Sequence, residues 1–216
     1  MLATSEDRQG NEEFIHISMA ALEPSGEKDI LYIGPAVSGQ LKELSKYSLS
    51  SLDCVQINPI VSRLARLGMP KEITSAARVI TQDPRSYLKQ TSKKYDAIII
   101  SMPAPMSLAL NRYFTQEFFA LAASRLKTKG IFAFSIPSKR EILSPSFASF
   151  NSIIINALNR EFKSKIIVPS DSMLVVCANG KNLKSQGLIA NFSTNRIKTF
   201  FLTTHHLASL LDHSIA

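Results

Sequence analysis

Residues able to bind a ligand gather where apolar runs of the sequence end. Four such stretches are Gly34–Gly39, Gln56–Pro59, Gln82–Asp83 and Ser101–Arg112. Glycine lets the backbone approach a ligand closely, and the first N–H groups of a following helix can point at that ligand. Gly34 and Gly39 suit this role, but they also suit the plain end of a strand and the start of a helix. The sequence leaves both interpretations open.

Gln56 and Asp83 are candidates for contacts to a nucleoside. Gln56 ends an apolar run about 20 residues after the glycine turn, where dinucleotide-binding proteins place the carboxylate that binds ribose hydroxyls. An amide in this place weakens the hydrogen bond by roughly 1–2 kcal/mol, or about tenfold in affinity. Asp83 either accepts a hydrogen bond from an adenine amino group or caps the helix predicted to begin at Pro84, and the two uses are compatible.

The stretch after the fourth apolar run holds the candidates for an acceptor site. Ser101 starts a loop with two prolines, and Asn111 and Arg112 follow it. Arg112 either places its guanidinium over the site or hydrogen-bonds carbonyl groups at the strand ends. If the chain is a transferase, we expect Ser101, with Asn111 or Arg112, to shape the acceptor site.

No metal site is predicted. His205 and His206 are adjacent and His213 lies eight residues after the first, a spacing unlike that of metal ligands. Cys54 and Cys177 lie inside apolar runs rather than in a Cys-x-x-Cys pattern, so we expect both thiols to be buried and reduced.

Strand-like apolar runs alternate with helical patterns along most of the chain. The predicted strands cover residues 29–33, 52–57, 77–80, 95–100, 131–136, 165–168 and 173–177. This alternation predicts right-handed βαβ units in a doubly wound, mostly parallel α/β sheet, with ligands beyond the carboxyl ends of the strands. The last two strands are joined by too short a turn for a crossover, so they must pair antiparallel.

The chain of 216 residues, 45% of them hydrophobic, is predicted to form one domain in three parts. A polar tail over residues 1–11 and a short helix occupy 1–28, the α/β core occupies 29–180, and a C-terminal extension occupies 181–216. The extension contains a strand candidate over 198–202 and a small helix over 205–211. No run reaches the roughly 18 apolar residues of a membrane span, so we expect a soluble, cytoplasmic chain.

The net charge of +8 and the pI near 9.6 raise the question of anionic partners. The basic residues between positions 139 and 198 are scattered and lack an interleaved aromatic pattern. They indicate a solvated basic face and argue against a nucleic acid partner.

Five motifs occurring in order carry a resemblance to a known family. They are Gly34–Leu41, Val55–Pro59, Arg78–Leu88, Tyr95–Pro105 and Leu110–Phe119. Together they resemble the spermidine synthase-like proteins, a branch of the S-adenosylmethionine-dependent methyltransferase fold, and most of all the bacterial form often fused to membrane helices. The resemblance implies a Rossmann-like seven-stranded sheet of the class I methyltransferase type with an antiparallel last strand.

The same resemblance implies a pocket for S-adenosylmethionine or a related adenosyl compound, formed by Gly34, Gly39, Gln56, Asp83 and Ser101. It also suggests a membrane-side context, so the chain would be the soluble cytoplasmic-side part of a membrane protein, with a protein partner or a homo-oligomer. Glu12, Glu13 and His16 echo the segment that precedes the core in the family, and this chain has too few residues there for the family's amino-terminal β domain.

Departures from the family pattern fall on the chemistry. Pro35, Ala36 and Val37 replace a glycine-rich turn and would crowd the donor, and Ser101 and Ala104 stand where active relatives carry acidic residues. An alkylamine with a pKa near 10.4 is protonated at neutral pH, and loss of a general base costs about 10²–10⁴ in rate. We therefore expect a degenerate site in a non-catalytic binding or scaffolding module. The alternative is a transferase that moves a methyl or aminopropyl group to an unknown acceptor.

Overall fold

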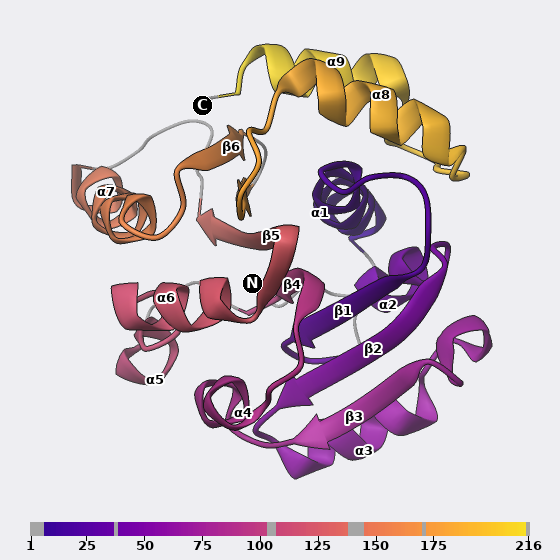
Figure 1. Cartoon of the computed structure of the whole chain (residues 1–216), viewed down its shortest axis with the longest axis vertical. Coiled ribbons are helices and arrows are strands. Elements are labelled where there is room, and N and C mark those ends of the chain that lie inside the picture. Colours follow the sequence, from indigo (N-terminus) through magenta and orange to yellow (C-terminus); the bar gives the residue numbers. More distant parts are fainter. Residues whose placement is uncertain (1–6, 37–38, 103–106, 138–144, 170–171, 215–216) are drawn as a thin grey trace.

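A central seven-stranded sheet organises the computed structural model, which describes residues 7–36, 39–102, 107–137, 145–169 and 172–214. The strands are β1 (Lys28–Ile33), β2 (Leu49–Gln56), β3 (Ala77–Thr81), β4 (Tyr95–Ile100), β5 (Leu126–Pro137), β6 (Ser164–Val168) and β7 (Ser172–Ala178). Their order is β3-β2-β1-β4-β5-β7-β6, with parallel pairing from β3 to β5 and β7 antiparallel to both β5 and β6. The predicted doubly wound sheet with an antiparallel last strand is confirmed (Figure 1).

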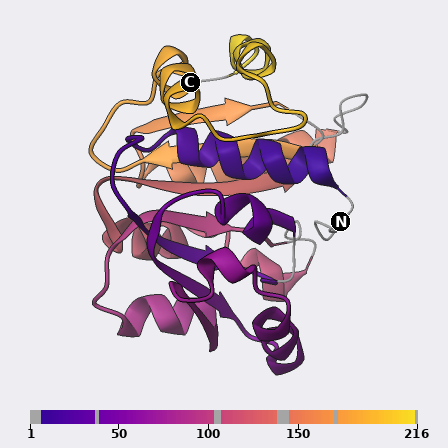
Figure 2. The same ribbon diagram turned by 90° about the vertical axis from the view of Figure 1, so that its right-hand side faces the viewer.

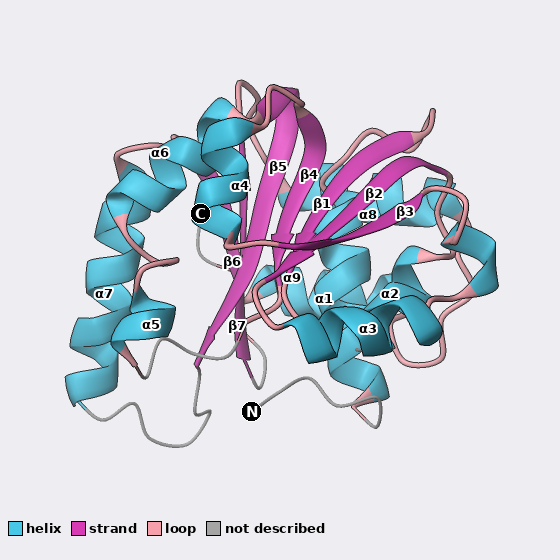
Figure 3. Cartoon of the chain, turned by 90° about the horizontal axis from the view of Figure 1, so that it is seen from below, coloured by secondary structure: helices cyan, strands magenta, loops and turns pink. Residues whose placement is uncertain are grey.

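Helices cover both faces of the sheet. They are α1 (Arg8–Ala20), α2 (Gly39–Leu44), α3 (Pro59–Leu67), the short 3-10 helix η1 (Lys71–Ile73), α4 (Pro84–Gln90), α5 (Leu108–Asn111), α6 (Gln116–Ser124), α7 (Pro145–Asn159), α8 (Ser185–Asn195) and α9 (Thr204–Asp212). Helices α4 to α7 lie on one side, and α1, α2, α3, α8 and α9 lie on the other (Figure 3). The two faces bury separate hydrophobic clusters, with Ala97 and Ile99 of β4 in one and Ile98 and Ile100 in the other. A strand apolar on both faces is what such a sheet requires.

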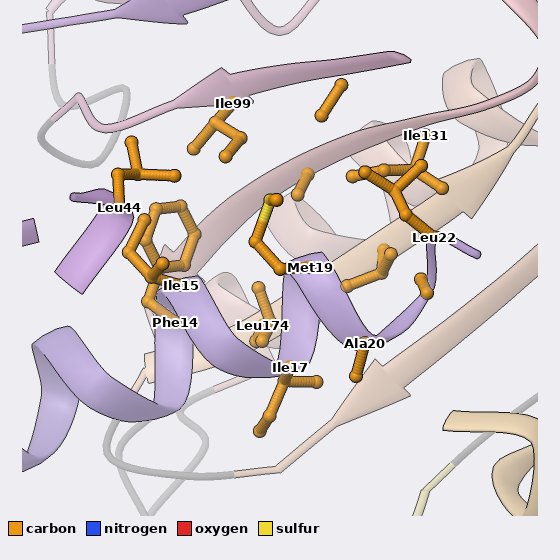
Figure 4. Packing of buried hydrophobic residues seen from close by; sticks show 14 of the residues in the cluster. Phe14, Ile15, Ile17, Met19, Ala20, Leu22, Leu44, Ile99, Ile131 and Leu174 are labelled. Atoms are coloured by element: carbon orange, nitrogen blue, oxygen red, sulfur yellow. The ribbon is translucent and has the colours of Figure 1, made fainter. Parts of the chain in front are cut away.

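The polar tail predicted over residues 1–11 extends too far, because helix α1 begins at Arg8 and Asn11 is already buried. Asp7 accepts a hydrogen bond from the Gly10 N–H and starts α1, and every residue from Asn11 to Ala20 is buried. Met19 points from this helix toward the strands that carry Ile99 and Ile131 (Figure 4). Helix α1 lies between α2 and the C-terminal pair α8 and α9 (Figure 2).

The strand predicted over residues 198–202 is absent from the described segment. The backbone N–H groups of Phe200, Phe201 and Leu202 instead donate to the carboxylate of Glu12, at 2.8 to 3.1 Å. Because these donors are engaged with a buried side chain of α1, they cannot join the sheet. Helix α9 matches the predicted helix over 205–211, whereas the sequence analysis did not predict α8.

Strand β5 begins five residues before the strand predicted over 131–136. It runs from Leu126 to Pro137, with Lys129 at a φ of 67°. The pairing of β4 with β5 shifts register between Tyr95 and Ala97, so the added residues at the start of β5 form an irregularity within the sheet.

Candidate functional site

The candidate site lies at the carboxyl ends of the parallel strands β1 to β4. We call the described residues there, 34–36, 56–58, 81–83, 101–102 and 107–115, the strand-end loops. Parallel strands end at the same edge, so residues far apart in the sequence meet there. The sequence-predicted residues Gly34, Gln56, Asp83, Ser101 and Arg112 all belong to these loops.

Gly34 holds the end of β1 between its two neighbouring strands. Its N–H donates to the carbonyl of Val55 at 3.2 Å, and the N–H of Ser101 donates to the carbonyl of Ile33 at 2.8 Å. The φ of Gly34 is +142°, and an added Cβ would overlap the Ser101 carbonyl oxygen and lie 2.9 Å from its carbonyl carbon. The strand-end role thus accounts for this glycine without a ligand. Gly39 begins α2, as expected, and Val37 lies outside the described residues.

Gln56 is buried with one polar atom unsatisfied. It is the last residue of β2 and 5% exposed, and its carbonyl accepts from the N–H of Gln82 at 3.0 Å. Within the described part of the chain, its side-chain Nε2 has no hydrogen-bond partner. An unsatisfied buried amide costs about 1–3 kcal/mol, and an unobserved ligand or water is a common reason for one. A hydroxyl group that accepts from Nε2 would satisfy it.

Asp83 joins α4 to the segment after α5. One carboxylate oxygen, Oδ1, accepts from the Ser86 N–H at 3.0 Å and caps α4, which confirms the predicted cap. The other oxygen, Oδ2, accepts from the Tyr113 hydroxyl at 3.0 Å and forms an ion pair with the Arg112 guanidinium. The described bond of Arg112 therefore goes to this carboxylate, rather than to a strand-end carbonyl. Asn111 is exposed at the end of α5.

These contacts fix the charges at the site. Burial would raise the pKa of Asp83, but the Ser86 N–H, the Tyr113 hydroxyl and the Arg112 guanidinium hold it below its usual range. Burial and the hydrogen bond to Asp83 raise the pKa of Tyr113 to about 12. Asp83 is the one carboxylate and Arg112 the one cation in the strand-end loops as described. The described site is thus neutral overall at pH 7, with its single negative charge already paired.

Ala36 and Ala104 are two further residues that the sequence analysis placed at the site. Ala36 is 1% exposed and belongs to the hydrophobic cluster on the α1 face, so its side chain is part of the core. Ala104 lies outside the described residues. Tyr113 was missed by the sequence analysis, although its place directly after Arg112 in a motif already singled out was a usable signal.

Metal-ligand clusters and membrane-spanning helices are both absent from the described ranges. In them, no three His, Cys, Asp or Glu side chains are grouped to hold a metal ion. Both cysteines are buried and free, as predicted. No helix of the described chain has the length and apolarity needed to cross a membrane.

Comparison with known proteins identifies the family. The spermine/spermidine synthase domain model matches residues 9–143, more than half of the chain, and the chain belongs to this family. It is 29% identical over 133 residues to the polyamine aminopropyltransferase of Oceanobacillus iheyensis, covering 58% of this chain and 26% of that protein. It is 31% identical over 109 residues to that of Methanocaldococcus jannaschii, covering 48% of this chain and 37% of the relative. The aligned regions thus span well under half of these relatives.

Solved structures agree on the fold. Spermidine synthase from Thermotoga maritima superposes with a TM-score of 0.72 at 16% identity, covering 95% of this chain and 71% of that one. Human methyltransferase-like protein 13, in complex with SAH, gives a TM-score of 0.68 at 16% identity, covering 86% and 90% of the two chains. The sheet is therefore of the class I methyltransferase type, as the sequence predicted.

Proposed function

We propose that this chain is a spermidine synthase-like domain without aminopropyltransferase activity, serving as a binding or scaffolding module. The observation that carries the proposal is the ion pair between Asp83 and Arg112, in strand-end loops whose described residues offer no second carboxylate. A site for polyamine transfer must hold a cation and deprotonate it. This pairing leaves no free anion for either task.

The chemistry of polyamines explains why a site without a free carboxylate would not carry out the transfer. An alkylammonium group with a pKa near 10.4 is almost wholly protonated at pH 7, and only the free amine attacks a donor carbon. Bringing the cation out of water without a partner is costly, and the basic chain as a whole repels it. Loss of the base alone lowers a rate by about 10²–10⁴.

The test is an aminopropyl transfer assay with decarboxylated S-adenosylmethionine and putrescine or spermidine, following release of methylthioadenosine. The Thermotoga maritima spermidine synthase serves as the positive control. We expect release by this chain to stay at the enzyme-free rate. Turnover above the enzyme-free rate would overturn the proposal, and loss of that turnover in Asp83→Asn would show a working carboxylate at this site.

A second candidate function is supported by the unsatisfied amide of Gln56. An adenosyl donor would fit the strand-end loops if the Gln56 Nε2 donated to a ribose hydroxyl, and relatives of the same fold are solved with SAH and with the transition-state analogue AdoDATO. In this reading Asp83 would accept from the adenine amino group, and Ser101 with Asn111 or Arg112 would border an uncharged acceptor. The donor would supply the methyl or aminopropyl group that is transferred.

Calorimetric titration with S-adenosylmethionine, its decarboxylated form and methylthioadenosine tests this second candidate. We expect Gln56→Glu to tighten binding about tenfold, because a carboxylate gives a charge-assisted hydrogen bond to a ribose hydroxyl. Gln186→Glu, the same change at an exposed site in α8, should leave binding unchanged. No heat of binding with the wild type or with Gln56→Glu would contradict the nucleoside assignment.

A further inference from the structure

Helix α3 exposes an unusual share of the large apolar side chains of the molecule. Ile60 is 70% exposed, Leu64 52% and Leu67 79%. Spacings of four and three residues place the three on one face of the helix, opposite the buried Ser62 and Ala65. Helix α3 lies beside the edge strand β3, on the side of the molecule away from α8 and α9 (Figure 1).

The apolar face continues toward the candidate site. Ile57, directly after Gln56, is 60% exposed and precedes the helix. The Asn58 side chain accepts from the Ile60 N–H at 2.9 Å, and Pro59 occupies the first turn, so the start of α3 is firmly capped. Exposed apolar patches rimmed by polar residues mark interaction surfaces. We call Ile57, Ile60, Leu64 and Leu67, with Arg63 on their flank, the α3 face.

The shape of the apolar stripe favours a helix as its partner. At 100° per residue, Ile60, Leu64 and Leu67 span about 60° of the helix circumference. A stripe this narrow resembles the seam between two packed helices, whereas helices that lie in a membrane interface bury a wider apolar face.

The charge of the α3 face favours an acidic partner. Residues 57–72 contain three basic residues, Arg63, Arg66 and Lys71, and one acidic residue, Glu72. Arg66 donates to the carbonyl of Val79 at 3.1 Å, and Arg63 is exposed beside the stripe. A second copy of the chain would bring like charges together across the interface, in a protein whose net charge is already +8.

We propose that the α3 face binds an amphipathic helix of a partner protein, with acidic residues flanking the apolar seam of that helix. The partner would lie next to the strand-end loops, because Ile57 follows Gln56 in the chain. The inference does not depend on whether the domain transfers any group.

A synthetic helical peptide tests the proposal. The probe has about three heptads, with Leu at the a and d positions and Glu at e and g, and a matched peptide carries Lys in place of Glu. We expect the acidic peptide to bind with a micromolar Kd, measured by fluorescence anisotropy, and the Lys peptide to bind at least about tenfold more weakly. The double variant Leu64→Ser with Leu67→Ser should weaken binding of the acidic peptide about tenfold or more.

The control replaces an exposed isoleucine elsewhere. Ile153 of α7 is 69% exposed, so Ile153→Ser removes an exposed apolar side chain outside the α3 face and should leave peptide binding unchanged. Unaltered thermal unfolding of all variants checks that the fold is kept. Equal binding of the two peptides, or binding unaffected by the double variant, would overturn the proposal. Two other results would also overturn it if the peptides do not bind. One is binding to vesicles of phosphatidylserine and phosphatidylcholine that the double variant loses. The other is dimerisation in sedimentation that the double variant loses.

Discussion

Gly34→Ala should lower the free energy of unfolding by about 4 kcal/mol, enough to leave a typical domain barely folded. The φ of +142° is a conformation that side-chain-bearing residues rarely adopt, and this strain costs about 1–3 kcal/mol. The new methyl group would also overlap the backbone of Ser101, and its relief would push β1 away from β4. Urea unfolding followed by circular dichroism measures the change.

The matched control is Gly187→Ala in α8. An added Cβ meets nothing within 4 Å there, and alanine is favoured over glycine inside a helix by about 1 kcal/mol, so this variant should be slightly more stable than the wild type. An unfolding free energy of Gly34→Ala within about 1 kcal/mol of the wild type would contradict the close packing inferred at the strand ends, since strain and overlap each cost that much or more.

Local patterns predicted most of the fold because strands and helices here follow their own periodicity. The apolar runs ending at Ile33, Ile100 and Val168 became strands within one or two residues of the predicted bounds. The strand predicted over 198–202 failed because a carboxylate about 190 residues away captures its N–H groups. Local sequence holds no trace of such a contact.

The sequence was enough to predict which residues lie at the candidate site, but not how their side chains are paired. The topology brings Gln56, Asp83 and Ser101 to one edge as soon as the strands are recognised, since parallel strands end together. That Asp83 is paired with Arg112 depends on the short helix α5 and on the path of the chain after it, neither of which the sequence analysis predicted. The unsatisfied amide of Gln56 likewise depends on how its neighbours pack.

A buried carboxylate in β2 is the source of the second large expected effect on stability. The side chain of Asp53 is 3% exposed and accepts hydrogen bonds from Arg78 at 3.0 Å, Lys93 at 3.0 Å, Tyr95 at 2.7 Å and Tyr87 at 3.1 Å. Burial would raise the pKa of this carboxyl, but the hydrogen bonds from Tyr95, Lys93 and Arg78 hold it below its usual range. The network joins β2 to β3, β4 and the loop before β4.

Asp53→Asn should therefore cost about 1–3 kcal/mol of unfolding free energy at pH 7, because an amide cannot accept all the hydrogen bonds that the carboxylate accepts. The two cations, Arg78 and Lys93, are 64% and 32% exposed and keep part of their hydration, which limits the loss. A carboxyl whose pKa is lower in the folded than in the unfolded chain stabilises the fold at pH values above its unfolded pKa of about 3.9. This contribution is lost as the pH falls through the folded pKa. The difference between wild type and Asp53→Asn should accordingly shrink as urea unfolding is repeated from pH 7 toward pH 3.

Asp212→Asn, at an exposed carboxylate that ends α9, provides the control and should change stability by less than about 0.5 kcal/mol at any pH. A difference between wild type and Asp53→Asn that stayed constant with pH would mean that the loss of an acceptor oxygen, rather than the loss of the charge, accounts for the cost, since asparagine and aspartate have nearly the same shape. One titration thereby separates two outcomes: loss of charge pairing gives a pH-dependent cost, and loss of an acceptor oxygen alone gives a pH-independent one.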